Sequence, residues 1–162
     1  QQIPLSHLSA LLLGICISIY FFNARPARMF LGDSGAQTLG FIFAAIAILY
    51  IPDAAHQSSS WFVPILLVGV PIFDTTLVFF SRLRRKKPIY KGDLDHTYHR
   101  LVALGMDSGR AVQIMHIAAL LLQCVAFIAL SLSPYLANTI FAICLVFAAG
   151  FYFWLDRKIL WT

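Results

Sequence analysis

Residues 29–37 read MFLGDSGAQ and place one carboxylate, Asp33, between two glycines at the start of a long apolar run. Two interpretations of Asp33 are open. Its oxygens could accept hydrogen bonds from the N–H groups of the first helical turn, as a helix cap does. Alternatively, the carboxylate could ligate a hard cation such as Mg²⁺ near Arg25 and Arg28, where phosphates and the cation would meet. The two roles are compatible because they can use different oxygens.

Two histidines lie further along the chain, in the stretch DLDHTYHRLVALGM. His96 and His99 are three residues apart, so on a helix they would share one face. Without further ligands they are a weak zinc signal, and surface histidines beside basic residues are commonly just solvated. With Arg100 adjacent and more cations upstream, however, this patch suits a diphosphate, because arginine offers bidentate donors and histidine offers directional ones.

Asp74 lies inside an apolar segment, where an unpaired charge would be costly. It is therefore expected to pair with a cation, to line a polar cavity, or to cap a helix after a break at Pro71. The basic run at residues 82–87 is interpreted mainly as a stop-transfer signal and an anchor for anionic lipids. Asp93 suits the N-cap of a short interfacial helix, and Asp107 or Ser108 is expected to cap the next span.

The elements that carry these residues are predicted to be membrane helices. Of the 162 residues, 60% are hydrophobic and only 12% are charged, which is typical of an integral membrane protein. Five apolar runs approach the ~20 residues that cross a bilayer. These predicted spans cover residues 5–22, 34–51, 61–80, 111–133 and 135–155. The fold class is thus predicted to be all-α, a polytopic transmembrane helical bundle, with a bend in the third span because it contains Pro64, Gly69 and Pro71.

The basic residues indicate the orientation of the spans. All twelve lysines and arginines fall before the second span, between the third and fourth spans, or after the fifth. The positive-inside rule therefore predicts that loops 23–33 and 81–110 and the C-terminus are cytoplasmic. The predicted membrane topology accounts for the excess of basic over acidic residues. A nucleic-acid partner is therefore not expected. The three cysteines lie in apolar spans without metal-ligand spacing and are interpreted as packing residues.

Two motifs together resemble a known enzyme family. The segment NARPARMFLGDSGAQTLGF resembles a signature of the polyprenyl-phosphate N-acetylhexosamine-1-phosphate transferases, which belong to glycosyltransferase family 4. The matching positions are Asn23, Pro26, Ala27, Arg28, Phe30, Gly32, Asp33 and Gly35. Further along the chain, at residues 71–105, PIFDTTLVFFSRLRRKKPIYKGDLDHTYHRLVALG resembles the family's Pro-x-x-Asp-Thr span end, its basic loop and its histidine motif. The arginine after the last histidine fits the bacterial N-acetylglucosamine-1-phosphate branch better than the muramyl-pentapeptide branch.

The resemblance implies a reaction. The family transfers N-acetylhexosamine 1-phosphate, most simply GlcNAc-1-phosphate here, from a UDP-sugar to undecaprenyl phosphate and releases UMP. It implies a Mg²⁺ cofactor, with Mn²⁺ as an alternative, bound by a catalytic Asp33. It further implies that Phe30 stacks on uracil and that Asn23 contacts the nucleotide. The expected location is the bacterial inner membrane, where the product starts an envelope polysaccharide such as lipopolysaccharide or teichoic acid.

The histidine motif departs from the family pattern. The resemblance implies that His96 and His99 are catalytic and hold the diphosphate or the sugar together with Arg100. Tyr98 stands where the family usually has its middle histidine. Only His96 and His99 are therefore expected to have the roles of the family's histidine motif.

The chain is expected to be the C-terminal half of a longer enzyme. It begins Gln1-Gln2-Ile3, and nothing in it matches the aspartate motifs of the family's N-terminal half. It should therefore be inactive without that half. The sequence also leaves open whether the protein forms a homodimer. A rival interpretation is a non-catalytic, truncated or degenerate membrane module that binds lipid or a partner subunit. A transporter subunit ranks last, because it would need several charged residues near the middle of the membrane. In this sequence Asp74 is the one charged residue expected to approach that depth.

Overall fold

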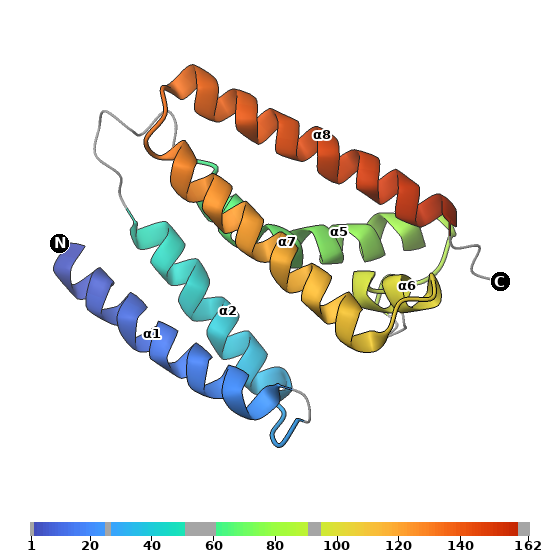
Figure 1. Cartoon of the computed structure of the whole chain (residues 1–162), viewed down its shortest axis with the longest axis horizontal. Coiled ribbons are helices and arrows are strands. Elements are labelled where there is room, and N and C mark those ends of the chain that lie inside the picture. Colours follow the sequence, from blue (N-terminus) through green and yellow to red (C-terminus); the bar gives the residue numbers. More distant parts are fainter. Residues whose placement is uncertain (1, 25–26, 51–60, 91–94, 159–162) are drawn as a thin grey trace. The chain divides into compact units, whose positions relative to one another are not determined.

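The fold is built from helices (Figure 1). The computed structural model describes residues 2–24, 27–50, 61–90 and 95–158, and this part of the chain contains no strand. The helices are α1 (Gln2–Asn23), α2 (Gly32–Leu49), α4 (Val63–Leu67), α5 (Gly69–Arg84), α6 (Thr97–Ala103), α7 (Ser108–Ala129) and α8 (Pro134–Lys158). They fall into two compact units, Gln1–Asp53 and Ala54–Thr162. The predicted all-α class is confirmed.

Four of the helices are long and apolar enough to cross a membrane. These candidate spans are Pro4–Asn23, Gly32–Leu49, Ser108–Ala129 and Pro134–Lys158. Their mean hydropathy lies between 1.3 and 2.1, and each is at least 18 residues long, close to the ~20 residues that a bilayer requires. Large apolar side chains on their surfaces are exposed, as lipid-facing side chains are. The protein is therefore a multi-pass membrane protein.

The third predicted span is broken, as its sequence indicates. It is divided into α4, of five residues, and α5, of 16 residues, with Val68 between them at φ −107° and ψ 23°. Pro71 has no N–H group to donate to the carbonyl of Leu67 four residues earlier, so the helical ladder is interrupted there. The predicted bend is confirmed, and its cause is the proline.

The first unit is a hairpin of α1 and α2. Helix α1 ends at Asn23, and the chain turns back so that the N–H groups of Arg28 and Met29 both donate to the carbonyl oxygen of Phe22, at 2.9 and 3.2 Å. Leu12 is buried in α1, whereas no described residue of α2 is buried. The hairpin therefore presents most of its apolar side chains outward, and its described charged residues, Arg28 and Asp33, lie at or beside the turn.

The second unit has α7 packed against its other helices, with α8 beside it in Figure 1. Two apolar clusters hold it together. One contains Phe62, Val63, Leu66, Ala126, Ala129, Ala137 and Phe141, and the other contains Leu77, Leu101, Ala111 and Leu155. The small alanines let the helices approach closely, which is how membrane helices commonly pack. Gly69 acts in the same way, because a Cβ there would lie 2.9 Å from Cδ1 of Leu122.

Candidate functional site

Asp33 lies in the first turn of α2 and is exposed. The helix begins at Gly32 with Leu31 in the N-cap position, and no side chain caps it. The interpretation of Asp33 as a helix cap is therefore wrong. No hydrogen bond or ion pair joins its carboxylate to any residue in the described part of the chain. The carboxylate is therefore available to a ligand.

Two more predicted site residues lie at the same turn. Asn23 is exposed at the end of α1, and the ring of Phe30 is 84% exposed, two residues before the start of α2. A phenylalanine ring in that position presents a flat face that can stack on a planar ligand. An amide, an aromatic ring and a carboxylate are therefore all exposed at this turn, and their contacts with a substrate stay predictions.

The chemistry of the turn fits a cation that is shared with phosphates. Mg²⁺ is usually held by one or two carboxylates together with waters and substrate phosphates. Asp33 supplies one such carboxylate without a competing intramolecular partner. Within the described ranges no group of three or more His, Cys, Asp or Glu side chains could hold a metal. This turn therefore offers one carboxylate ligand, Asp33, and the described residues form no complete protein cage.

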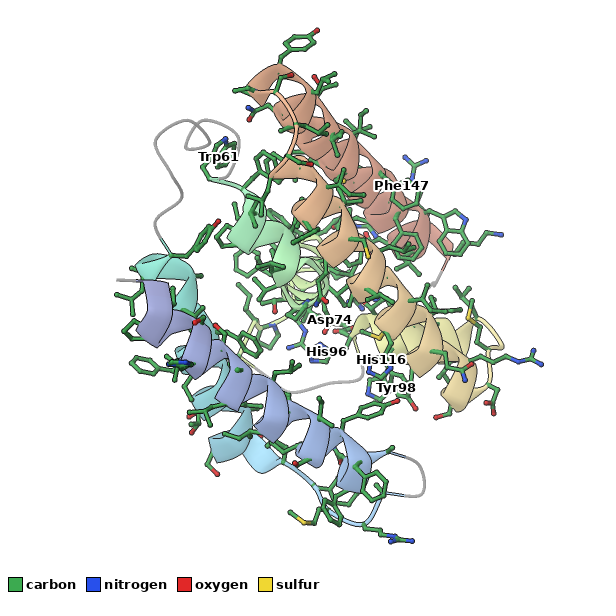
Figure 2. All side chains as sticks on the ribbon, turned by 60° about the vertical axis from the view of Figure 1, so that its left-hand side comes forward. Trp61, Asp74, His96, Tyr98, His116 and Phe147 are labelled. Carbon is green, nitrogen blue, oxygen red and sulfur yellow. The ribbon has the colours of Figure 1, made fainter. Side chains whose placement is uncertain are left out.

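His96 occupies a different position from the one its spacing predicted. It is the N-cap of α6 and has an extended backbone, with φ −66° and ψ 154°, so it does not share a helical face with His99. Its Nδ1 lies 2.7 Å from Oδ2 of Asp74 on α5, and the side chain is 53% exposed. Figure 2 shows the two side chains side by side. Asp74 was expected to pair with a cation, to line a polar cavity or to cap a helix; it pairs with His96, whose ring is a cation only when protonated.

Asp74 also caps α6. Its Oδ1 accepts a hydrogen bond of 2.6 Å from the backbone N–H of Thr97, the first residue of that helix. The cap therefore comes from another helix, and α6 begins four residues after Asp93, which was predicted to cap it. Asp93 itself lies outside the described residues. The predicted cap of the next span is confirmed, since the side chain of Asp107 accepts from the N–H of Gly109 at 2.9 Å.

The two residues that follow Thr97 have separate surroundings. The hydroxyl of Tyr98 makes a hydrogen bond with Oγ of Ser108, which joins α6 to the start of α7. Its ring packs against the cluster that contains Leu77, so Tyr98 has a structural position in this chain. His99 is half-buried, and its ring lies edge-on to that of Tyr98 with the centroids 5.0 Å apart.

Arg100 is fully buried, with 0% of its surface exposed. Its Nε donates to the carbonyl oxygen of Asp95 at 2.8 Å, and its Nη2 donates to Oγ of Ser81 at 2.7 Å. Its Nη1 forms an ion pair of 3.3 Å with Asp156 on α8. The side chain thus holds three parts of the second unit together. In this arrangement it offers no surface to a substrate, so the predicted substrate contact of Arg100 has no support from its geometry.

The basic run is also built into the second unit. Nε of Arg82 lies 3.0 Å from Oδ2 of Asp95, and Nη2 of Arg85 lies 2.8 Å from Oδ1 of the same carboxylate. Arg84 pairs with Asp156. The interpretation of residues 82–87 as mainly a lipid anchor is therefore wrong for Arg82 and Arg85. Arg84, Lys86 and Lys87 are exposed, and for them it stays a prediction.

Asp95 is held in its ionised form by this network. Burial would raise its pKa, but the hydrogen bonds and charges of Arg85 and Arg82 outweigh burial and lower the pKa below its usual value of 3.8. Ser81 also belongs here, since its hydroxyl donates to Oδ1 of Asp156 at 2.7 Å. The sequence did not single out Ser81, Asp95 or Asp156. The scarcity of acidic residues was the available signal, because each aspartate in such an apolar chain needs a partner.

The comparisons with known proteins match this chain to one family. The family model described as glycosyl transferase family 4 matches residues 1–51, which include the turn with Asp33. A probable undecaprenyl-phosphate N-acetylglucosaminyl 1-phosphate transferase of Bacillus subtilis is 30% identical over 86% of this chain and 39% of its own length. A decaprenyl-phosphate N-acetylglucosaminephosphotransferase of Mycobacterium tuberculosis is 31% identical over 70% of this chain and 31% of its own length.

A third relative has a similar name. An undecaprenyl-phosphate alpha-N-acetylglucosaminyl 1-phosphate transferase of Pasteurella multocida is 23% identical over 74% of this chain and 34% of its own length. This chain therefore spans between about a third and two fifths of the length of these three relatives. No solved structure is significantly similar to it.

Proposed function

Because the chain belongs to glycosyl transferase family 4, we propose that the full-length protein transfers N-acetylhexosamine 1-phosphate from a UDP-sugar to undecaprenyl phosphate. The sugar is most simply N-acetylglucosamine, and the second product is UMP. The names of the three relatives support the polyprenyl-phosphate acceptor and the N-acetylglucosamine 1-phosphate group. The order of the two motifs along the chain supports the UDP-sugar donor through the resemblance.

One observation carries the proposal. Asp33 presents an exposed carboxylate with no partner among the described residues, at a turn that also exposes Phe30 and Asn23. A carboxylate kept at the end of a membrane helix without a structural role is expected to serve a ligand. The family match covers this same turn. The proposal therefore rests on a local geometry within the matched segment.

The reaction depends on charge neutralisation and on alignment. Transfer of a phosphoryl group needs the attacking and leaving oxygens in line and the charge on the phosphate oxygens compensated, while covalent help from the protein is not required. A Mg²⁺ ion, when bound, would supply part of that compensation. Asp33 would hold the ion, Phe30 would stack on the uracil ring, and Asn23 would bind the nucleotide. His96 and His99 would orient the diphosphate or the sugar.

The protein is proposed to work at the cytoplasmic face of the bacterial inner membrane. Its basic residues cluster in the loops that the positive-inside rule places in the cytoplasm, where UDP-sugars are made. The acceptor phosphate would lie at the headgroup level beside the turn with Asp33. We propose that the chain acts together with an N-terminal half that carries further aspartates, since the relatives are more than twice as long.

The proposal is tested by measuring UMP release. The full-length protein is purified in detergent and supplied with undecaprenyl phosphate, Mg²⁺ and a panel of UDP-sugars. The wild type is expected to release UMP with UDP-N-acetylglucosamine. The D33N variant is expected to lose about 10²–10³-fold in kcat, because the carboxylate that would hold the charge-compensating Mg²⁺ ion is lost.

The matched control is D107N. Asp107 is an exposed aspartate that caps α7, and asparagine caps a helix equally well, so this variant should keep the wild-type rate. Absence of UMP release from every UDP-sugar in the panel would overturn the proposed reaction. Wild-type turnover by D33N would overturn the role of Asp33.

A further inference from the structure

The pairing of Asp74 with His96 has consequences for the histidine. Asp74 comes from α5, and both of its oxygens are used, one by Nδ1 of His96 and one by the N–H of Thr97. Figure 2 shows the carboxylate and the imidazole ring directed toward one another. Because both oxygens are engaged, Asp74 is not available to a substrate in this arrangement. Its effect on a reaction must pass through the residues that it holds.

The hydrogen bond determines which nitrogen of His96 faces outward. A carboxylate accepts hydrogen bonds and donates none when ionised, so the proton of the neutral ring must lie on Nδ1. Nε2 then points away from Asp74, and no hydrogen bond joins it to a residue in the described ranges. More than half of the side chain is exposed. A free imidazole favours the opposite tautomer, with its proton on Nε2, so the protein changes the preference of this ring.

The same carboxylate fixes the start of α6. His96 provides no side-chain cap for its own helix, and the cap comes from Oδ1 of Asp74 instead. Helix α6 carries His99 and is joined to α7 through Tyr98 and Ser108. One side chain on α5 thus sets both the orientation of the His96 ring and the position of the helix that follows it.

We propose that Asp74 is a positioning residue, which holds His96 through Nδ1 so that Nε2 faces the phosphate groups of the substrate. This inference rests on the proposed function, since it assigns the substrate from that reaction. A carboxylate that orients a functional histidine through the nitrogen not used for function is a common arrangement in proteins, and its loss typically costs 10–100-fold in activity. The retention of an acidic residue in an apolar helix agrees with such a role.

The first measurement is spectroscopic and does not depend on activity. The full-length protein is labelled with ¹⁵N-histidine in detergent micelles, and the His96 signals are assigned by their loss in H96Q. The neutral ring is expected to carry its proton on Nδ1 in the wild type and in D107N. In D74N and D74L that tautomer should lose population to the form with its proton on Nε2. A wild-type ring with its proton on Nε2 would overturn the proposal.

The second measurement is kinetic. D74N is expected to lower kcat/KM for UMP release about 10–100-fold. In H96Q the additional change of Asp74 to Asn should have little further effect, because residues that act as a unit are not additive. D107N removes the charge from another helix-capping aspartate, at the start of α7, and should match the wild type. Fully additive losses in the double variant would overturn the proposal.

The two measurements separate this inference from the proposed function. If no UDP-sugar supports UMP release, the proposed function fails, while the tautomer of His96 still reports whether Asp74 holds the ring. If UMP is released and the tautomer does not respond to D74L, the positioning role fails and the proposed function stands. The thermal melting of each variant shows whether it is folded, and D74N is used for kinetics because it changes the shape least.

Discussion

Replacement of Asp95 by asparagine should strongly destabilise the second unit. Asp95 is 2% exposed, and its carboxylate forms ion pairs with Arg82 at 3.0 Å and with Arg85 at 2.8 Å. The side chain of Arg82 is only 5% exposed. In D95N the amide keeps one oxygen as an acceptor but loses the charge. Two arginines would then share a buried region without the carboxylate that compensates them.

The expected magnitude follows from the cost of an uncompensated buried charge. Removal of one partner of a buried ion pair costs about 3–5 kcal/mol, because the remaining charge stays desolvated. The amide oxygen of asparagine can still accept one hydrogen bond, and Arg85 is partly exposed, so the lower end of this range applies. We expect a loss of about 3 kcal/mol in the free energy of unfolding. This corresponds to about a hundredfold change in the folding equilibrium.

The assay is reversible unfolding in mixed detergent micelles, followed by tryptophan fluorescence. D107N is the matched control, because it makes the same chemical change at an exposed helix cap, where asparagine is as good as aspartate. The control should stay within about 0.5 kcal/mol of the wild type. A loss in D95N no larger than that of the control would refute the reasoning that the buried network is held by this carboxylate.

The pH dependence of stability has the same origin. The pKa of Asp95 is lower in the folded protein than its usual value of 3.8, so its contribution to stability is fully present above pH 3.8. The contribution is lost as the pH falls below 3.8 and passes through the folded pKa. The wild type should therefore lose stability in this acidic range more steeply than D95N. Parallel curves for the two proteins would contradict the assignment.

Two further predictions concern packing and backbone conformation. F62A should lower the free energy of unfolding by about 3–5 kcal/mol, since Phe62 is fully buried and stacks on Phe141 with ring centroids 4.7 Å apart. F79A is the control in the same unfolding assay, because Phe79 is 40% exposed. G105A should lower the free energy of unfolding by about 1–2 kcal/mol, because Gly105 has φ +93°. A Cβ at this position would meet no other atom within 4 Å, so the cost comes from the backbone alone. An unchanged midpoint of unfolding would contradict this prediction.

Features that depend on neighbouring residues could be predicted from the sequence. The cap of α7 by Asp107 follows from an aspartate placed directly before an apolar run. The break between α4 and α5 follows from Pro71, which removes a donor wherever the helix lies. The exposed turn with Asp33 follows from a short polar segment between two spans. In each case the physical cause lies within about four residues.

Features that depend on distant partners could not be predicted in this way. Arg100 was interpreted as a substrate ligand because it follows a histidine, yet its partners Ser81 and Asp156 are 19 and 56 positions away along the chain. Physical chemistry requires that a buried cation has anions near it, but the local sequence does not indicate which anions pack against it in the folded protein. For the same reason Asp74 was expected to have a partner, and the identity of that partner, His96, came from the fold.

The helical spacing of the histidines was a different kind of error. The prediction that His96 and His99 share a face assumed that both lie in one helix. The helix begins at Thr97 because its cap is supplied by Asp74 from another element, which no local signal in the sequence reveals. His96 therefore has an extended backbone and points toward α5, while His99 lies within α6.

The central claim is that the Asp33 carboxylate binds a divalent cation together with the substrate diphosphate. The most direct measurement is the binding of Mn²⁺, as a paramagnetic substitute for Mg²⁺, to the full-length protein with and without UDP-N-acetylglucosamine. The wild type should bind Mn²⁺ more tightly when the nucleotide sugar is present, and D33N should lose that increase while D107N keeps it. An equal increase in D33N would contradict the claim.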